Sequence, residues 1–155
     1  MFDRLRALFE EGAGRQVAGS HADELEVAVA ALLVETASAD ASLGEDERGL
    51  IRQLLERRFG LAPDQAMALE AAAERRAENS AQLFGFARTI TERLPRERRL
   101  VVIELLWEVA YADGVLDPLE DSLVRRIGGL IDVSDHERGE ARLRVLARLG
   151  LKEEE

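Results

Sequence analysis

The sequence predicts an all-α domain, and three observations carry this prediction. The 155 residues contain only three prolines and are rich in Ala, Leu, Glu and Arg, which are good helix formers. Apolar residues recur at spacings of three and four along most of the chain, which is the period of an amphipathic helix. The length suits one domain with a real core, because a chain of this size buries roughly 68–70% of its unfolded surface.

Composition changes divide the chain into three parts. Residues 1–21 predict a short amphipathic helix, with Phe2, Leu5, Leu8 and Phe9 on one stripe, followed by a glycine-containing flexible tether. This helix can dock on its own domain, on a partner or on a membrane surface. Residues 22–150 form the helical domain, and residues 151–155 form an acidic tail.

Seven helices are expected in the domain, and their ends follow from helix-breaking and capping residues. Gly60 is a fitting stop for the second helix, and Pro63 opens the third. Pro95 separates the fourth helix from the fifth, and Ser134 caps the last. The expected ranges are 23–40, 45–59, 63–78, 82–94, 96–113, 118–131 and 135–149.

The first and fifth helices are apolar on most faces, so we expect them to be central. Trp107 and Tyr111, four residues apart on the fifth helix, are expected in the core rather than as a ligand-stacking pair. Met67 is expected to fill space in the core, and His136 to be exposed. The inward residues of the last two helices are expected to be Leu119, Leu123, Ile127 and Leu130, and then Leu143, Leu146 and Leu149.

Two parts of the sequence resemble each other when the chain is aligned with itself at an offset of 113 − 40 = 73 residues. One residue is missing later in the second copy, so the offset becomes 137 − 65 = 72 there. The pattern predicts two three-helix repeats that are joined by a bridging helix and arranged as a pseudo-symmetric bundle. The matched pairs are Leu32 with Leu105, Glu35 with Glu108, Asp40 with Asp113, Leu43 with Leu116, Glu47 with Glu120, and Gln65 with Glu137.

An acidic turn joins two strong helices of the second repeat. Its sequence is Ala112-Asp113-Gly114-Val115-Leu116-Asp117-Pro118-Leu119-Glu120, preceded by Leu-Trp-Glu-Val-Ala-Tyr. This stretch resembles the signature of the tellurite-resistance protein B (TerB) family, and the likeness covers about residues 22–150. The resemblance implies an all-helical fold, an association with tellurite and other chemical stress, and metal binding by acidic residues.

Two interpretations of the acidic turn stay open at this stage. Asp117, Pro118 and Glu120 suit a helix N-terminus with a capping box, and Gly114 suits the end of the preceding helix. Capping does not explain Asp113, because a carboxylate at the C-terminal end of a helix faces the negative pole of the dipole. Either amide groups at the start of the following helix or a hard cation such as Ca²⁺ or Mg²⁺ would compensate it. The candidate metal-binding residues are Asp40, Glu47, Asp113, Asp117 and Glu120.

This turn is not an EF-hand. In a 12-residue loop counted from Asp113, Val115 takes the third position, Pro118 the place of the required glycine, and Val124 the place of the bidentate glutamate. A metal site here would therefore be of another kind.

Composition excludes several classes of function. The net charge of −10 argues against binding to duplex nucleic acid, which needs a basic surface. The absence of cysteine and the isolation of the two histidines exclude a zinc ribbon and a thiol nucleophile. No run of the sequence approaches the roughly 20 apolar residues of a membrane-spanning helix. We assign no catalytic residue and no cofactor beyond the divalent cation.

These observations lead to two hypotheses about function. The first is a non-enzymatic, cytoplasmic TerB-like stress-response module with a divalent cation at its acidic turns. The alternative is a scaffold or adaptor for a protein partner, peripheral to the membrane through its N-terminal helix, with purely structural acidic turns.

Overall fold

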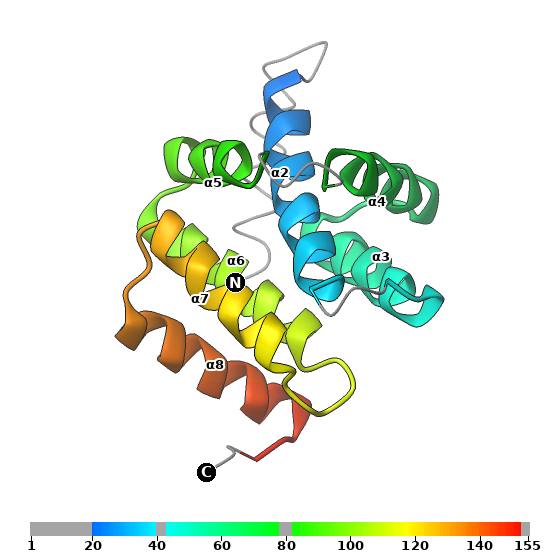
Figure 1. The fold of residues 1–155 in the computed structure, drawn as a ribbon. Helices are drawn as coiled ribbons and strands as arrows, with labels where there is room; N and C mark the ends of the chain where they lie inside the picture. Colours follow the sequence, from blue (N-terminus) through cyan, green and yellow to red (C-terminus); the bar gives the residue numbers. More distant parts are fainter. Residues whose placement is uncertain (1–19, 40–42, 78–81, 153–155) are drawn as a thin grey trace.

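The computed structural model describes residues 20–39, 43–77 and 82–152, and these residues form seven helices, as the sequence predicts. The predicted N-terminal helix and tether lie almost entirely outside the described residues, as does the end of the acidic tail. The helices are α2 (Ser20–Ala37), α3 (Glu45–Phe59), α4 (Pro63–Ala77), α5 (Gln82–Arg93), α6 (Arg96–Ala110), α7 (Pro118–Leu130) and α8 (Asp135–Leu149) (Figure 1).

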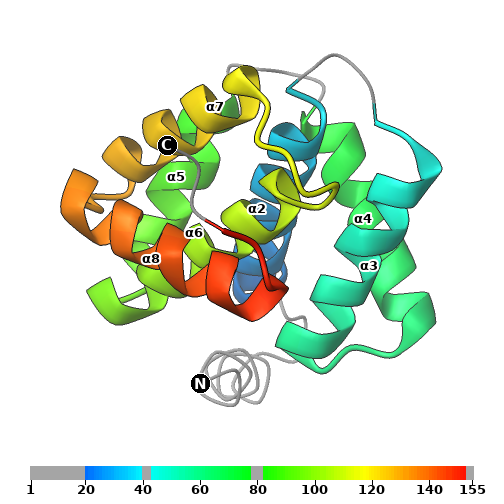
Figure 2. The ribbon, with the colours of Figure 1, turned by 90° about the horizontal axis from the view of Figure 1, so that it is seen from below.

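Helices α2 and α6 form the centre of the domain. Seen from below, they lie between α3 and α4 on one side and α5, α7 and α8 on the other (Figure 2). Helix α2 packs most extensively on α4 and α5, and α6 packs most extensively on α8 and α2. Every residue of α6 from Val101 to Ala110 is buried. The prediction of two central helices follows from this all-round apolar pattern and is confirmed.

The helix boundaries of the two halves match at the offsets seen in the sequence. At the offset that pairs Asp40 with Asp113, the end of α2 falls on the end of α6, and the start of α3 falls on the start of α7. At the slightly shorter offset that pairs Gln65 with Glu137, α4 and α8 coincide at both ends. The repeat hypothesis accounts for these boundaries, with α5 as the bridging helix.

Local sequence signals set several of the observed ends. Gly60 closes α3 in the left-handed conformation, at φ 67°, which a residue with a side chain rarely adopts. The Ser134 hydroxyl caps α8 by accepting from the backbone N–H of Glu137. The Glu137 carboxylate in turn accepts from the backbone N–H of Ser134. The Glu137 pKa is lowered by this backbone hydrogen bond, and Arg96 adds a further ion pair.

Two central aromatic residues lie in the core, as expected. Trp107 and Tyr111 are buried, with ring centroids 6.0 Å apart and ring planes inclined by 42°. The Trp107 indole N–H donates to the carbonyl oxygen of Arg138 at 3.1 Å, which satisfies its polar atom. The Tyr111 hydroxyl accepts from Arg142. His136 is exposed, as predicted.

Some expected faces were wrong. Leu119 is 58% exposed, and Leu143 and Leu149 are also exposed, because the inner faces of α7 and α8 are shifted round each helix from the predicted leucine rows. Met67 is exposed on α4 rather than filling the core. The residues that α7 and α8 bury are Glu120, Val124, Ile127 and Gly128, and Ala141, Val145 and Leu146.

Within the described part of the chain, no helix is both long enough and apolar enough to cross a bilayer.

Candidate functional site

The carboxylates of the acidic turn lie against backbone amides. Asp117 is the N-cap of α7 and accepts from the backbone N–H of Leu119 at 2.8 Å, so its predicted capping role is confirmed. Helix α6 ends at Ala110 rather than at the predicted Asp113, so Asp113 lies beyond the helix. Its Oδ1 accepts from the Val115 amide at 3.1 Å, which compensates the carboxylate. Gly114 completes the turn at φ 86°.

The other predicted metal ligands do not lie in the turn between α6 and α7. Glu47 accepts from the Gly44 amide at 2.7 Å at the start of α3, which is again a capping contact. Glu120 is buried on the inner face of α7, and Asp40 lies outside the described residues. Among the residues that the structure describes, no three carboxylates, histidines or cysteines form a group that could hold a metal ion. The five-residue site therefore stays a prediction.

A network of ion pairs around two buried carboxylates joins three helices beside the end of α6. Glu104 and Glu108 are only 4% and 8% exposed, although both are charged. Glu104 accepts from Arg144 at 2.9 Å and from Arg148 at 2.7 Å, both on α8. Glu108 accepts from Arg148 at 2.7 Å and from Arg58 on α3. The two carboxylates of α6 therefore bind both neighbouring helices.

Burial and pairing act in opposite directions on these arginines. Burial lowers the pKa of the Arg58 guanidinium, and the Glu108 carboxylate opposes that shift. Burial also lowers the pKa of Arg148, but hydrogen bonds to Glu104 and Glu108 outweigh it, and the net direction is upward. The network is a structural contact between helices, because each carboxylate is already paired.

A groove of about 310 Å³ lies between the C-terminal end of α2 and α7. Glu35 is half-buried in it, and burial raises the pKa of its carboxyl, which nearby Arg126 partly offsets. Leu119, Ser122, Leu123 and Arg126 form the α7 wall. This arrangement joins a desolvated carboxylate to exposed aliphatic surface, and it can receive a side chain that has both an apolar stem and a positive charge.

A second groove of about 300 Å³ occupies the corresponding place at the end of α6. Its wall includes Glu108 from α6, Tyr111 just after that helix, Leu50 and Arg57 from α3, and Leu149 at the end of α8. The glutamates of the two grooves, Glu35 and Glu108, are matched in the sequence repeat. In this second groove the carboxylate is already held by arginines of the chain itself.

The sequence interpretation missed both glutamate environments. A signal was present for α6, because Glu104 and Glu108 are spaced four residues apart within a helix that is otherwise almost continuously apolar. Charged residues at such positions are rarely fully buried unless they are paired. For Glu35, the repeat identified the position, but only the fold shows that α7 leaves a groove beside it.

Together, these features define an all-α domain with two central helices, a buried ion-pair network and open grooves at the helix ends. The family model for the tellurite resistance protein TerB matches residues 26–143. The chain therefore belongs to the TerB family, as the acidic turn and repeat led us to expect.

Comparison with solved structures agrees with this fold. The chain is similar to a protein of unknown function from Porphyromonas gingivalis W83, with a TM-score of 0.60 and 22% sequence identity. The match covers 81% of this chain and 95% of the other. At this identity the likeness bears on the fold alone. No match was found among curated proteins.

Proposed function

We propose that this TerB-family chain is a non-enzymatic protein-interaction module whose acidic turns are structural. The observation that carries the proposal is the groove between α2 and α7, where the exposed Leu119 and the half-buried Leu123 flank the half-buried Glu35. Grooves that combine apolar walls with a few placed polar groups are typical of binding sites. A role in the response to tellurite or other chemical stress, which the family's description suggests, belongs to the same proposal.

The use of the turn carboxylates supports a structural role for them. Glu47, Asp113 and Asp117 each accept from a backbone amide that is close by along the chain. Such contacts satisfy the free N–H groups of a helix start or turn and are worth about 0.5–2 kcal/mol each. These hydrogen bonds give the three carboxylates a structural role without a bound metal ion.

The test is reconstitution with a purified partner. The full-length chain is used as bait, captured proteins are produced separately, and their dissociation constants are measured by calorimetry. Leu119→Asp on α7 is compared with Leu143→Asp on α8, because both leucines are exposed and both changes add the same charge. The proposal expects saturable binding that only Leu119→Asp weakens. Failure to reconstitute any partner contradicts it, and so does equal binding by both variants.

A divalent cation at the acidic turns is the second candidate. Asp113 and Asp117 lie in one turn. In each of them Oδ1 accepts a hydrogen bond from a backbone amide. A hard cation would use the remaining oxygens of this turn, and Asp40, which lies outside the described residues, is the predicted ligand that would have to complete the site. Ca²⁺, Mg²⁺ and Mn²⁺ titrations followed by melting temperature and amide chemical shifts test this. Saturable changes that Asp113→Asn abolishes, and Glu97→Gln leaves intact, would establish the cation.

Peripheral membrane contact through residues 1–21 remains a separate prediction, because almost all of that segment lies outside the described residues. Co-sedimentation with vesicles of neutral and anionic lipid tests it. Binding that disappears when residues 1–20 are deleted would support membrane contact, and equal sedimentation of both chains would contradict it.

A further inference from the structure

The two matched glutamates at the ends of the central helices have unlike surroundings. Glu108 is held by Arg58 and Arg148. Among the described residues, the Glu35 carboxylate makes neither a hydrogen bond nor an ion pair, although Arg126 acts on it at longer range. In the part of the chain that the structure describes, Glu35 therefore lacks an ion pair of the kind that Glu108 makes within the chain.

The sequence explains the part of this difference that concerns Arg58. Arg58 approaches Glu108 from the C-terminal end of α3, which is the repeat equivalent of α7. At the offset that matches Glu35 with Glu108, the position of Arg58 is taken by Ile131, a fully buried aliphatic residue at the end of α7. A guanidinium group is therefore absent from this position in the chain.

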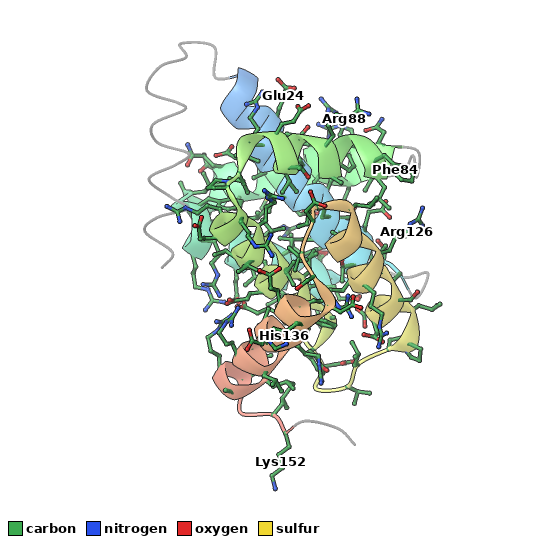
Figure 3. The ribbon with its side chains drawn as sticks, turned by 90° about the vertical axis from the view of Figure 1, so that its left-hand side faces the viewer. Glu24, Phe84, Arg88, Arg126, His136 and Lys152 are labelled. Atoms are coloured by element: carbon green, nitrogen blue, oxygen red, sulfur yellow. The ribbon has the colours of Figure 1, made fainter. Side chains whose placement is uncertain are left out.

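Arg126 does not replace the missing group. Its guanidinium carbon lies 5.7 Å from the ring centroid of Phe84 on α5, which places it in a cation–π contact. Both side chains lie at one edge of the molecule, at the ends of α5 and α7 that face each other (Figure 3). Phe84 is itself 54% exposed. This contact holds the Arg126 charge over the aromatic ring, and Glu35 receives only partial compensation.

The walls of the groove suit the stem of a long basic side chain. Leu119, Leu123 and Arg126 share one face of α7, at positions i, i+4 and i+7. Leu119 is exposed and Leu123 half-buried, so both offer apolar surface next to the carboxylate. An arginine lays its methylene stem on such surface and carries its charged end inward.

We propose that the groove between α2 and α7 binds an arginine of a protein partner, with the guanidinium paired to Glu35 and flanking apolar residues on Leu119 and Leu123. Arginine fits better than lysine because a guanidinium is more weakly hydrated and binds a carboxylate through two parallel hydrogen bonds. The chain itself uses arginine for Glu108. The net charge of −10 draws a basic segment toward the domain. This inference rests on the proposed interaction function and names the chemistry of the partner.

The test uses the full-length chain and a short synthetic peptide that carries one arginine between two leucines. A matched peptide carries citrulline, which has the same shape without the charge. Binding is followed by NMR at about pH 8, through the amides of residues 35–39 and 119–126 and the side-chain carboxyl carbon of Glu35. We expect saturable shifts at these sites, and binding of the citrulline peptide to be about tenfold weaker or more.

Two substitutions should act in opposite directions. Glu35→Gln keeps the shape of the side chain and should weaken arginine-peptide binding about tenfold or more. Arg126→Gln removes a like charge next to the incoming guanidinium and should strengthen binding. Glu97→Gln, at an exposed position in the first turn of α6, is the control and should change nothing. Circular dichroism verifies that each variant is folded.

Several results would overturn the inference: no saturable shift, equal binding of the citrulline peptide, unchanged binding by Glu35→Gln, or shifts centred elsewhere. These results are distinct from failure of the interaction function. A reconstituted partner that binds the parent chain and Glu35→Gln equally would reject the arginine site while leaving the module function intact. The absence of any reconstituted partner would reject the function itself.

Discussion

Replacing Glu108 with leucine should be among the most destabilising single changes in the domain. Glu108 is buried and accepts from Arg58 and Arg148. Arg148 retains Glu104 in the variant, but Arg58 is left buried without the carboxylate that it contacts. Removing one partner of a buried ion pair typically costs about 3–5 kcal/mol. At about 2–4 °C per kcal/mol for a chain of this size, the melting temperature should fall by roughly 6–20 °C.

A double-mutant cycle tests this explanation. Arg58→Met combined with Glu108→Leu removes both charges and should recover most of the lost free energy of unfolding, because well-packed apolar residues often replace a buried pair without cost. Arg125→Gln, which removes an exposed pair with Asp121, is the control and should cost less than about 1 kcal/mol. Urea unfolding measures the parent chain, both single variants, the double variant and the control. A double variant as unstable as Glu108→Leu, or a Glu108→Leu loss below about 1 kcal/mol, would refute the reasoning.

Three further predictions concern single sites. Ser134→Ala removes the hydrogen bond to the Glu137 amide and should cost about 1 kcal/mol in urea unfolding, whereas an unchanged midpoint would deny the cap. Trp107→Phe loses the bond to the Arg138 carbonyl and some volume, so about 1–3 kcal/mol should be lost, and a neutral change would contradict this contact. Glu35→Gln should stabilise the domain at neutral pH; the gain should vanish as pH falls below about 4.5, and a gain independent of pH would be inconsistent with a raised Glu35 pKa.

The pH dependence of that last prediction follows from the direction of the Glu35 shift. Burial raises the carboxyl pKa in the folded state above its ordinary value of 4.5. Below the unfolded pKa both states are protonated, and the group costs nothing. As pH rises through the folded pKa, the ionised form is disfavoured in the fold and stability falls. Glutamine has no charge and avoids this loss.

Much of the fold could be predicted because local signals and apolar periodicity agree. Gly60, Pro63, Pro95 and Ser134 mark helix ends in the sequence, and the observed helices end or begin beside them. The end of α6 could not be predicted, because apolar residues continue to Tyr111 and Ala112 while the backbone already turns after Ala110. A period of 3.6 residues shows that a helix is present, but it does not locate the last residue of that helix.

The inner faces of α7 and α8 show where sequence patterns fail. Leu119 and Leu143 belong to regular leucine rows, yet both are exposed, while neighbouring positions of α7 and α8 are buried instead. Gly128 and Ala141 are buried on these faces, and a Cβ at Gly128 would meet Ile103 of α6 at 3.9 Å. Sequence periodicity predicts that a helix has an apolar face. Which residues of that helix are buried depends on how the neighbouring helices pack against it.

The acidic turn was identified correctly as a turn, and its capping aspartate was predicted from Asp117-Pro118. The glutamate groove could not be found in the same way, because it depends on α7 lying beside the end of α2. The repeat supplied the comparison between Glu35 and Glu108, and the tertiary structure supplied the difference between them. The proposed recognition of an arginine therefore depends on a position at which the two copies of the sequence repeat differ.

The most direct test of the binding account is the pKa of the Glu35 carboxyl, measured by carbon-13 NMR with and without the arginine peptide. In the free chain, burial should hold the pKa above 4.5 despite Arg126. A bound guanidinium stabilises the ionised form, so the pKa should fall on saturation, and the citrulline peptide should not lower it. A pKa that the arginine peptide leaves unchanged at saturation would contradict the account.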